Sequence, residues 1–272
     1  MTVIATIITA HCTAHATDSY ITQVRSDGSR EVLEDQQTKI VRVDKWRGAM
    51  AYWGLARHGS DWSTLDWLRK RAKESHQYPT AEEFARDLGA LLSTELAKRG
   101  FQKPTDRGIG IHFTAYEQVE GYWVPELFQI RNWVDPSYSS VRTGDLMVTR
   151  ETYATLKNLA QREEGDRDDK RRLAVHAALH TEGRMLVYNN GDPVLFNPIA
   201  TAVLGSFQQL AIRSQLRDPT DSHTHLSLVR RPVEVVSRLQ VDLVKPGYRL
   251  VGGKPHDLAI TSDGRFTSTT GD

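Results

Sequence analysis

Thr2 follows Met1 directly, and removal of that methionine would expose an α-amine beside a hydroxyl group. An α-amino group titrates at about 7.7 to 8.0, so part of it is neutral near pH 7 and can accept the hydroxyl proton. One residue would then hold both a nucleophile and its base. A threonine at position 2 therefore predicts nucleophilic catalysis. The alternative is that Thr2 is simply one of the small residues that commonly follow an initiator methionine.

Asp18 and Lys39 are the charged residues that would support such a nucleophile. A buried lysine places positive charge near a hydroxyl and favours its ionised form, while a carboxylate orients and compensates the lysine. Asp18 ends one predicted strand, and Lys39 begins another. Together with Thr2 they predict a catalytic centre, whereas each residue taken alone also fits an exposed position.

The elements that must position these residues begin with strands. Apolar and β-branched residues fill 2–9 and 13–22, which predicts two paired strands. Alternation at 39–43 and 48–53 predicts a hairpin that turns near 45–47. The first fifty-odd residues are therefore expected to be nearly all β.

Helices and strands then follow in blocks, with a capping box before the second helix. The expected order is helices at 60–75 and 80–98, strands at 108–113 and 122–132, helices at 197–214 and 232–243, and strands at 248–260. Such blocks favour an α+β architecture with two sheets sandwiched between two helix layers. No internal repeat or low-complexity linker divides the chain, which predicts a single domain over 1–272.

Charge and cysteine content exclude several classes of partner. The 35 Lys and Arg residues against 34 Asp and Glu give a net charge of +1, which supplies no overall field for nucleic acid or an anionic membrane. No run approaches the roughly 20 apolar residues of a membrane span. Cys12 is the single cysteine and the first basic residue is Arg25, so a strand in a reducing cytoplasm fits better than an export signal.

Metal and nucleotide motifs are weak in this sequence. His11, Cys12 and His15 include positions that share a strand face, but no second Cys or His pair has the spacing of a zinc site. The histidines of 223–225 fall in a predicted polar loop and are interpreted in the same way. Neither a P-loop nor a GxGxxG motif is present, so no cofactor and no metal are expected.

The segments around the candidate residues resemble proteasome β-subunits and their bacterial relatives, which are N-terminal-nucleophile (Ntn) hydrolases. The similar segments are Thr2-Val3-Ile4-Ala5, Ala16-Thr17-Asp18-Ser19, Thr38-Lys39-Ile40 and Ala51-Tyr52-Trp53-Gly54-Leu55-Ala56. The resemblance covers about 2–132 and 195–265. It implies a four-layer αββα sandwich of the Ntn type, with 134–190 as an insertion.

The resemblance also implies a role for each site residue. Thr2 would attack an amide carbonyl and its amine would carry the proton. Lys39 would lower the pKa of the Thr2 hydroxyl, Asp18 would hold Lys39, and the Gly54 N–H would stabilise the oxyanion. A cytoplasmic threonine peptidase acting on peptide or amide substrates is the activity that follows.

Self-association is the partner expectation. The resemblance implies a homo-oligomer, and predicted helices carrying Trp62, Trp67 and Phe84 offer apolar surface for it, with burial inside one chain as the alternative. The range 134–190 would extend such contacts or block the closure of a ring. Neither nucleic acid nor a membrane is expected as a partner.

Two departures from the family pattern keep a second hypothesis open. Tyr248 and Val251 stand where family members carry an Asp and a Ser shortly before the Gly-Gly pair, here Gly252-Gly253. The family's Ser-Gly before the third helix has no match, because Gly205-Ser206 falls within a predicted helix. The alternative is a catalytically silent assembly or scaffold subunit.

Overall fold

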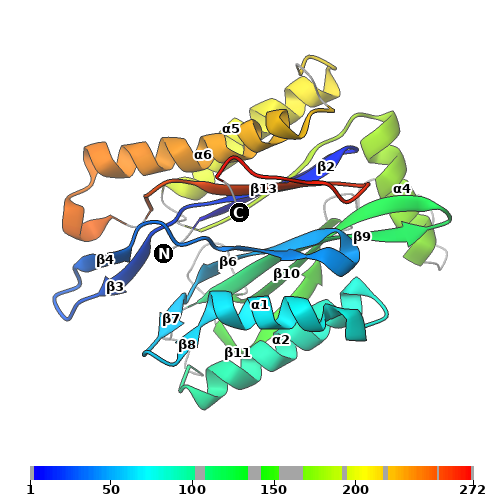
Figure 1. Cartoon of the computed structure of the whole chain (residues 1–272). Helices are drawn as coiled ribbons and strands as arrows, with labels where there is room; N and C mark the ends of the chain where they lie inside the picture. Colours follow the sequence, from blue (N-terminus) through cyan, green and yellow to red (C-terminus); the bar gives the residue numbers. More distant parts are fainter. Residues whose placement is uncertain are drawn as a thin grey trace.

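The computed structural model of the chain describes residues 3–101, 108–133, 142–152, 168–191, 195–216, 220–249 and 251–270. Within these ranges the strands form two five-stranded antiparallel sheets and two short ribbons. Two pairs of helices cover the outer faces of the two sheets, and α4 (Asp168–Thr181) lies at one end of the sheets (Figure 1). The expected mixture of helices and antiparallel sheets is confirmed.

The first sheet contains the first two strands of the chain as interior strands. Its order is β12-β1-β2-β13-β14, formed by Leu186–Asn190, Ile4–Ile8, Cys12–Thr17, His256–Thr261 and Phe266–Thr267. Every residue of β1 and β2 is buried. A strand covered on both faces reads as a continuous apolar run instead of an alternating one, which explains the sequence of β1.

The second sheet contains the predicted hairpin and the longest strands. Its order is β11-β10-β9-β6-β5, formed by Arg142–Arg150, Tyr122–Trp133, Ile109–Val119, Gly48–Gly54 and Ile40–Val43. The 3₁₀ helix η1, Asp44–Trp46, connects β5 to β6. Glu120 and Gly121 both have positive φ and form the tight turn between β9 and β10.

Two helix pairs cover these sheets on opposite sides. Helices α1 (Thr64–Glu74) and α2 (Ala81–Lys98) pack on the second sheet, and α5 (Phe196–Ile212) and α6 (Ser222–Leu243) pack on the first. Figure 1 shows the sheets between the two pairs. Helix α4 contacts β9 and β10. No helix in the described ranges is long and apolar enough to cross a membrane.

Separate apolar clusters fix each helix pair to its sheet. Phe84, Leu88 and Leu92 of α2 pack with Phe113 and Phe128 of the second sheet. Trp62 is buried in the same cluster and Trp67 is partly buried against it. The apolar side chains that were expected to serve self-association therefore pack in the core of the chain. Burial inside one chain was the alternative expectation.

Short elements complete the structure. They are the ribbons β3–β4 (Ile21–Val24 and Arg30–Glu34) and β7–β8 (Arg57–His58 and Trp62–Ser63), and the 3₁₀ helices η2 (Ser75–Gln77) and η3 (Pro246–Tyr248). The strand expected at 13–22 is two strands, because Asp18 to Tyr20 interrupt it. The expected strands around Gly252-Gly253 are replaced by η3 and a bend before β13.

The last long helix begins ten residues before the position predicted for it. Pro232 lies inside α6, and Asp221 is the N-cap, whose carboxylate accepts hydrogen bonds from the backbone N–H groups of His223 and Thr224. The expectation that Pro232 opens the helix was wrong. The polar loop expected at 223–225 was wrong as well, since those residues form the first turn of α6.

Most of the described residues of 134–190 belong to the two sheets and to α4. Strand β11 pairs with β10, and β12 pairs with β1. The range thus supplies one edge strand to each sheet. Its status as an insertion, and the single domain over 1–272, stay predictions.

Candidate active site

The side chains of Asp18 and Lys39 form an ion pair at the start of β1. Lys39 Nζ lies 3.0 Å from Asp18 Oδ1, and both side chains are fully buried. Lys39 directly precedes β5 in the second sheet, while Asp18 directly follows β2 in the first. The ion pair therefore connects the two sheets.

The same carboxylate also holds the beginning of the chain. Asp18 Oδ1 accepts a hydrogen bond from the backbone N–H of Val3 at 3.0 Å, and Oδ2 accepts one from the N–H of Tyr20 at 3.3 Å. The Tyr20 carbonyl in turn accepts a hydrogen bond from Lys39 Nζ at 2.7 Å. Lys39 is thus fixed beside the residue that follows Thr2, and Thr2 itself lies outside the described residues.

Burial sets the protonation behaviour of this lysine. Complete desolvation lowers the pKa of Lys39 below its ordinary value, and the Asp18 carboxylate opposes that shift. The Asp18 carboxylate and its hydrogen bond favour the charged ammonium, which burial alone would disfavour. The environment of Lys39 therefore suits a catalytic cation as well as a structural ion pair.

Gly54 is the last residue of β6, which pairs with β5, the strand that begins directly after Lys39. The Lys39 carbonyl accepts a hydrogen bond from Tyr52 N–H at 3.1 Å, so Gly54 lies two residues beyond this pairing. Its φ is +92°, and a Cβ atom there would collide with the Gly108 carbonyl oxygen. Backbone geometry alone thus requires glycine. The ribbon β7–β8 separates Gly54 from α1, and its oxyanion role stays a prediction.

The Gly-Gly pair packs against the residues that follow Asp18. Gly252 O accepts a hydrogen bond from Ser19 N–H at 3.2 Å, and a Cβ on Gly252 would enter the Tyr20 ring. Gly253 has a φ of +75°, and a Cβ there would strike Ser19 Oγ. Both glycines therefore allow the close approach that fixes the Asp18 segment.

The two departures from the family pattern lie outside this centre. Tyr248 is 56% exposed in η3, and Val251 is fully buried in the apolar cluster between the first sheet and its helices. Gly205 and Ser206 lie within α5, as expected. None of these residues hydrogen-bonds Lys39 or Asp18.

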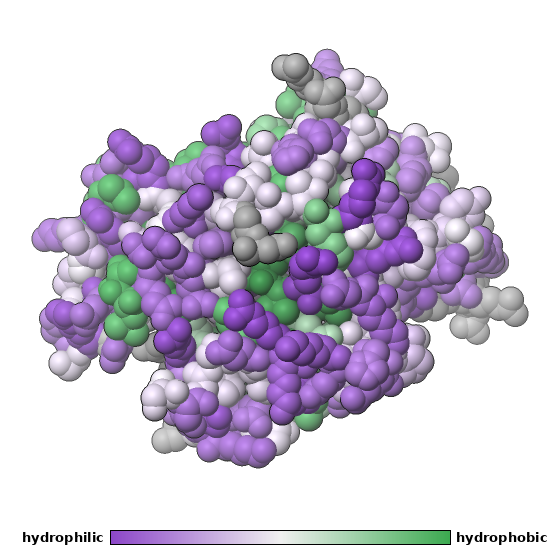
Figure 2. Space-filling view, viewed as in Figure 1, coloured by the Kyte–Doolittle hydropathy of each residue, from purple (hydrophilic) through white to green (hydrophobic). Residues whose placement is uncertain are grey.

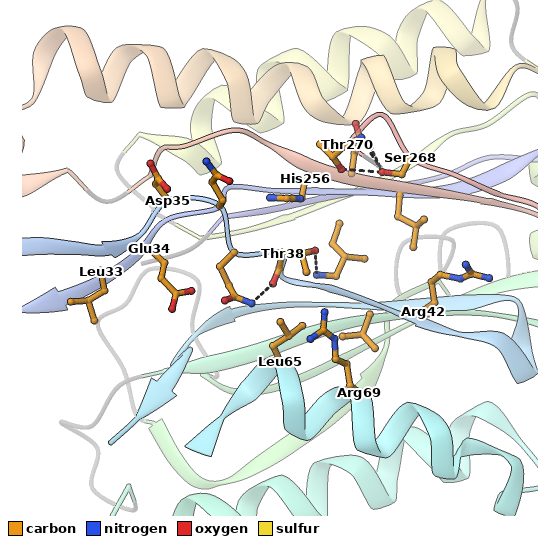
Figure 3. A pocket seen from close by; sticks show the side chains of 16 residues that line it. Leu33, Glu34, Asp35, Thr38, Arg42, Leu65, Arg69, His256, Ser268 and Thr270 are labelled. Atoms are coloured by element: carbon orange, nitrogen blue, oxygen red, sulfur yellow. Dashed lines mark hydrogen bonds between the residues drawn. The ribbon is translucent and has the colours of Figure 1, made fainter. Parts of the chain in front are cut away.

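A cleft of about 820 Å³ lies next to the ion pair (Figure 3). Thr38 and Ile40, the two neighbours of Lys39, line one side of it. The opposite side comes from β13 and the following segment, including His256 and Ser268. Figure 2 shows a hydrophobic area near the middle of a mostly hydrophilic face. Its walls combine apolar side chains with polar and charged ones. The cleft has no signal in the sequence, because its walls come from segments far apart in the chain.

The residues that the sequence offered as metal ligands do not form a metal site among the described residues. His15 is fully buried and hydrogen-bonds Thr6 and Thr114. Burial raises the pKa of the Cys12 thiol to about 12 and keeps it protonated. Within the described ranges, no group of three or more His, Cys, Asp or Glu residues is arranged to hold a metal ion.

Comparison with solved structures identifies a similar fold. The chain is similar to Anbu (ancestral beta-subunit) from Yersinia bercovieri, with a TM-score of 0.50 and 11% sequence identity, over 98% of this chain and 86% of that chain. No protein-family model and no curated protein matches the sequence. At this identity the likeness concerns the fold alone.

Proposed function

We propose that the chain is an N-terminal threonine amide-bond hydrolase, a proteasome-like peptidase. The observation that carries the proposal is the buried Lys39–Asp18 pair, because Asp18 Oδ1 also accepts the N–H of Val3. The cation is therefore held one residue from Thr2. In the same proposal, the two sheets and their helix pairs form the four-layer αββα sandwich of Ntn hydrolases.

The proposed reaction uses Thr2 after removal of Met1. Its hydroxyl oxygen attacks the amide carbonyl carbon while the α-amine accepts the hydroxyl proton. The Lys39 ammonium stabilises the developing alkoxide, and the Gly54 N–H donates to the oxyanion, a contribution typically worth about 3 to 4 kcal/mol. The C–N bond then breaks as the α-ammonium protonates the leaving amine. Water hydrolyses the resulting ester, with the α-amine as its base.

Mass spectrometry and covalent labelling test this proposal. We expect the protein purified from cells to lack Met1 and to react once with a threonine-directed electrophile such as an epoxyketone. Thr2→Ala should abolish labelling, and Thr2→Ser should retain part of it because the hydroxyl is kept. Retention of Met1, or equal labelling of Thr2→Ala, would rule out the enzyme.

A catalytically silent assembly or scaffold subunit is the second candidate. It is favoured by Tyr248 and Val251, since neither places a carboxylate or hydroxyl beside Lys39. The family's supporting polar groups are therefore not reproduced at these positions. Under this hypothesis the buried ion pair serves the fold alone, and the labelling experiment discriminates between the two candidates.

A second copy of this chain is the partner that the exposed surface supports best. Exposed apolar side chains gather where β4, the end of α6 and η3 meet, and they are Val32, Leu33, Val241, Leu243 and Tyr248. Helix η3 contacts β4, so the members are neighbours. Figure 2 shows hydrophobic areas at this end of the molecule. Surfaces of this kind mark association sites.

Light scattering at micromolar concentration is expected to give a mass that is a multiple of 30.7 kDa. Leu243→Glu should shift the population towards single chains, because the charge would be buried in the contact. Leu210→Glu, on the neighbouring helix α5, is the control, since Leu210 is also exposed but lies outside this group. A wild-type mass of one chain would contradict self-association and a sequestered proteolytic chamber.

A further inference from the structure

Asp257 is a buried carboxylate outside the proposed catalytic centre, and it holds the segment that follows β14. Its side chain is fully buried. Oδ1 accepts hydrogen bonds from the Thr269 N–H at 2.8 Å and from the Ser268 hydroxyl at 3.3 Å, and Oδ2 accepts one from the Thr269 hydroxyl at 2.5 Å. An ionised carboxylate can only accept hydrogen bonds, and all of these partners are donors. Asp257 therefore fixes the positions of 268–269.

Arg230 on α6 binds both partners of this contact. Its Nη1 lies 3.2 Å from Asp257 Oδ2, and the same atom donates a hydrogen bond to the Thr269 hydroxyl. Arg230 Nη2 also lies 3.1 Å from Glu234 Oε1, one turn further along α6. A buried charge is tolerated where it is paired and hydrogen-bonded. Asp257, Arg230 and Thr269 thus form a clamp between β13, α6 and the segment after β14.

The clamp takes the place of strand pairing at this point. Strand β14 pairs with β13 at only two positions, and Ala259 opposite Thr267 is the last of them. The same antiparallel register, continued by two residues, places Thr269 opposite Asp257. In the described part of the chain no backbone–backbone hydrogen bond holds 268–270. Side-chain hydrogen bonds therefore fix this segment.

Residues on either side of Thr269 form a wall of the cleft next to the ion pair (Figure 3). Ser268 and Thr270 line this cleft of about 820 Å³, and Thr38 lines it from the opposite side. The hydroxyl oxygens of Ser268 and Thr270 lie 3.0 Å apart and form a hydrogen bond. Because the clamp holds the residue between them, the position of this wall depends on the clamp.

The segment has a second attachment, on the other sheet. The Arg42 guanidinium of β5 lies 3.7 Å from the centroid of the Phe266 ring in β14, which is a cation–π contact. Arg42 also lines the cleft. Loss of the clamp would leave this contact and the pairing of β14 with β13 in place. We therefore expect a local release of 268–270 without unfolding of the chain.

We propose that Asp257 and Arg230 are positioning residues that hold 268–270 as a wall of the cleft, and that this wall determines how tightly the cleft binds a peptide substrate. The inference rests on the proposed peptidase function for the identity of the substrate. Both residues act through 268–270, whereas Thr2 and Lys39 carry the chemistry in that function. Release of the wall should therefore weaken substrate binding and leave the turnover of bound substrate nearly unchanged.

Thr269→Val tests the proposal, because it removes the hydroxyl that both Asp257 and Arg230 bind and keeps their ion pair. We expect KM for a fluorogenic peptide to rise roughly fivefold, the effect of one lost hydrogen bond, with kcat within about twofold of wild type. Thr269→Ser keeps the hydroxyl and should retain the wild-type KM. Thr261→Val, the same change at the end of β13 and outside the clamp, is the control.

A second measurement reports on the wall without any catalysis. Thr38→Cys places a thiol on the opposite side of the cleft, and Cys12, the single native cysteine, is buried and protonated. We expect a maleimide to label Thr38→Cys several times faster when Thr269→Val is added, and at an unchanged rate when Thr261→Val is added. Hydrogen exchange at 268–270 should also be faster in Thr269→Val, while its melting temperature stays that of the wild type.

The outcomes separate this inference from the proposed function. Wild-type labelling and exchange rates in Thr269→Val would overturn the inference whatever the activity, and so would a lower kcat at unchanged KM. Faster labelling in a chain whose wild type hydrolyses no peptide would support the clamp and contradict the peptidase function instead.

Discussion

Lys39→Met is expected to lower the rate of Thr2-dependent peptide hydrolysis by on the order of 10³-fold, because it removes the cation that favours the ionised hydroxyl. The same variant should lose about 3 to 5 kcal/mol of unfolding free energy, since Asp18 would remain as a buried carboxylate without its partner. Activity against a fluorogenic peptide and urea unfolding measure the two effects.

The double variant Asp18→Asn with Lys39→Met separates these effects. The asparagine side chain carries no charge, and its carbonyl oxygen can still accept the Val3 N–H that Asp18 Oδ1 accepts in the wild type. We therefore expect most of the lost stability to return while activity stays absent. A catalytically silent subunit would show the stability changes without any wild-type activity to lose. Full activity in Lys39→Met would contradict the proposed role of the lysine.

The Lys39–Asp18 pair could be predicted because the family resemblance is carried by short segments. Asp18 and Lys39 each occupy a strand end within a few similar residues, and the structure brings them to 3.0 Å. Asp18 directly follows β2 and Lys39 directly precedes β5, and these two strand ends lie next to each other. The contact between Asp18 and Lys39 could therefore be predicted from the sequence, while the catalytic roles of all four candidate residues stay predictions.

Other features depend on tertiary packing and left weaker signals. Pro232 sits in α6 where a helix start was predicted, because Asp221 already caps a longer helix. Strands β11 and β12 come from a charged and irregular stretch, and their neighbours in the sheets supply the pairing. The burial of His15 and His112 between two sheets has no signature in the sequence, because their partners come from distant strands.

Those two histidines give the second large prediction, a steep loss of stability in mild acid. Burial lowers the pKa of both His15 and His112 to about 3. The unfolded chain binds protons near 6.5, so it takes up protons that the folded chain excludes. The contribution of the two neutral histidines to stability is fully present above about pH 6.5, and it is lost as the pH drops towards 3.

A chain of hydrogen bonds between the sheets explains why protonation is costly. Asn190 Nδ2–H donates to His112 Nε2 at 2.9 Å, which leaves the His112 Nδ1–H to donate to Thr6 Oγ1 at 2.9 Å. The Thr6 hydroxyl then donates to His15 Nδ1 at 2.9 Å, and His15 Nε2–H donates to Thr114 at 2.7 Å. A proton added to either ring would place two donors face to face.

The expected size follows from the linkage relation. Each histidine costs about 1.4 kcal/mol per pH unit below 6.5, so the pair should remove about 4 kcal/mol between pH 7 and pH 5. His225 and His256, whose pKa values burial also lowers, act in the same direction. Carboxylates contribute little in this window, because their unfolded pKa values lie near 4.

Urea unfolding at pH 7, 6 and 5 measures the slope, and two variants assign it. His112→Asn should reduce the slope by the share of one proton, whatever its effect on stability at pH 7. Thr6→Val removes the central hydroxyl but keeps both imidazoles, so it should lower stability at pH 7 and leave a steep slope. Equal unfolding free energies at pH 7 and pH 5 in the wild type would mean that the buried rings accept protons in the folded state. The inter-sheet network would then rearrange, for instance by reorienting Asn190, instead of holding both histidines neutral.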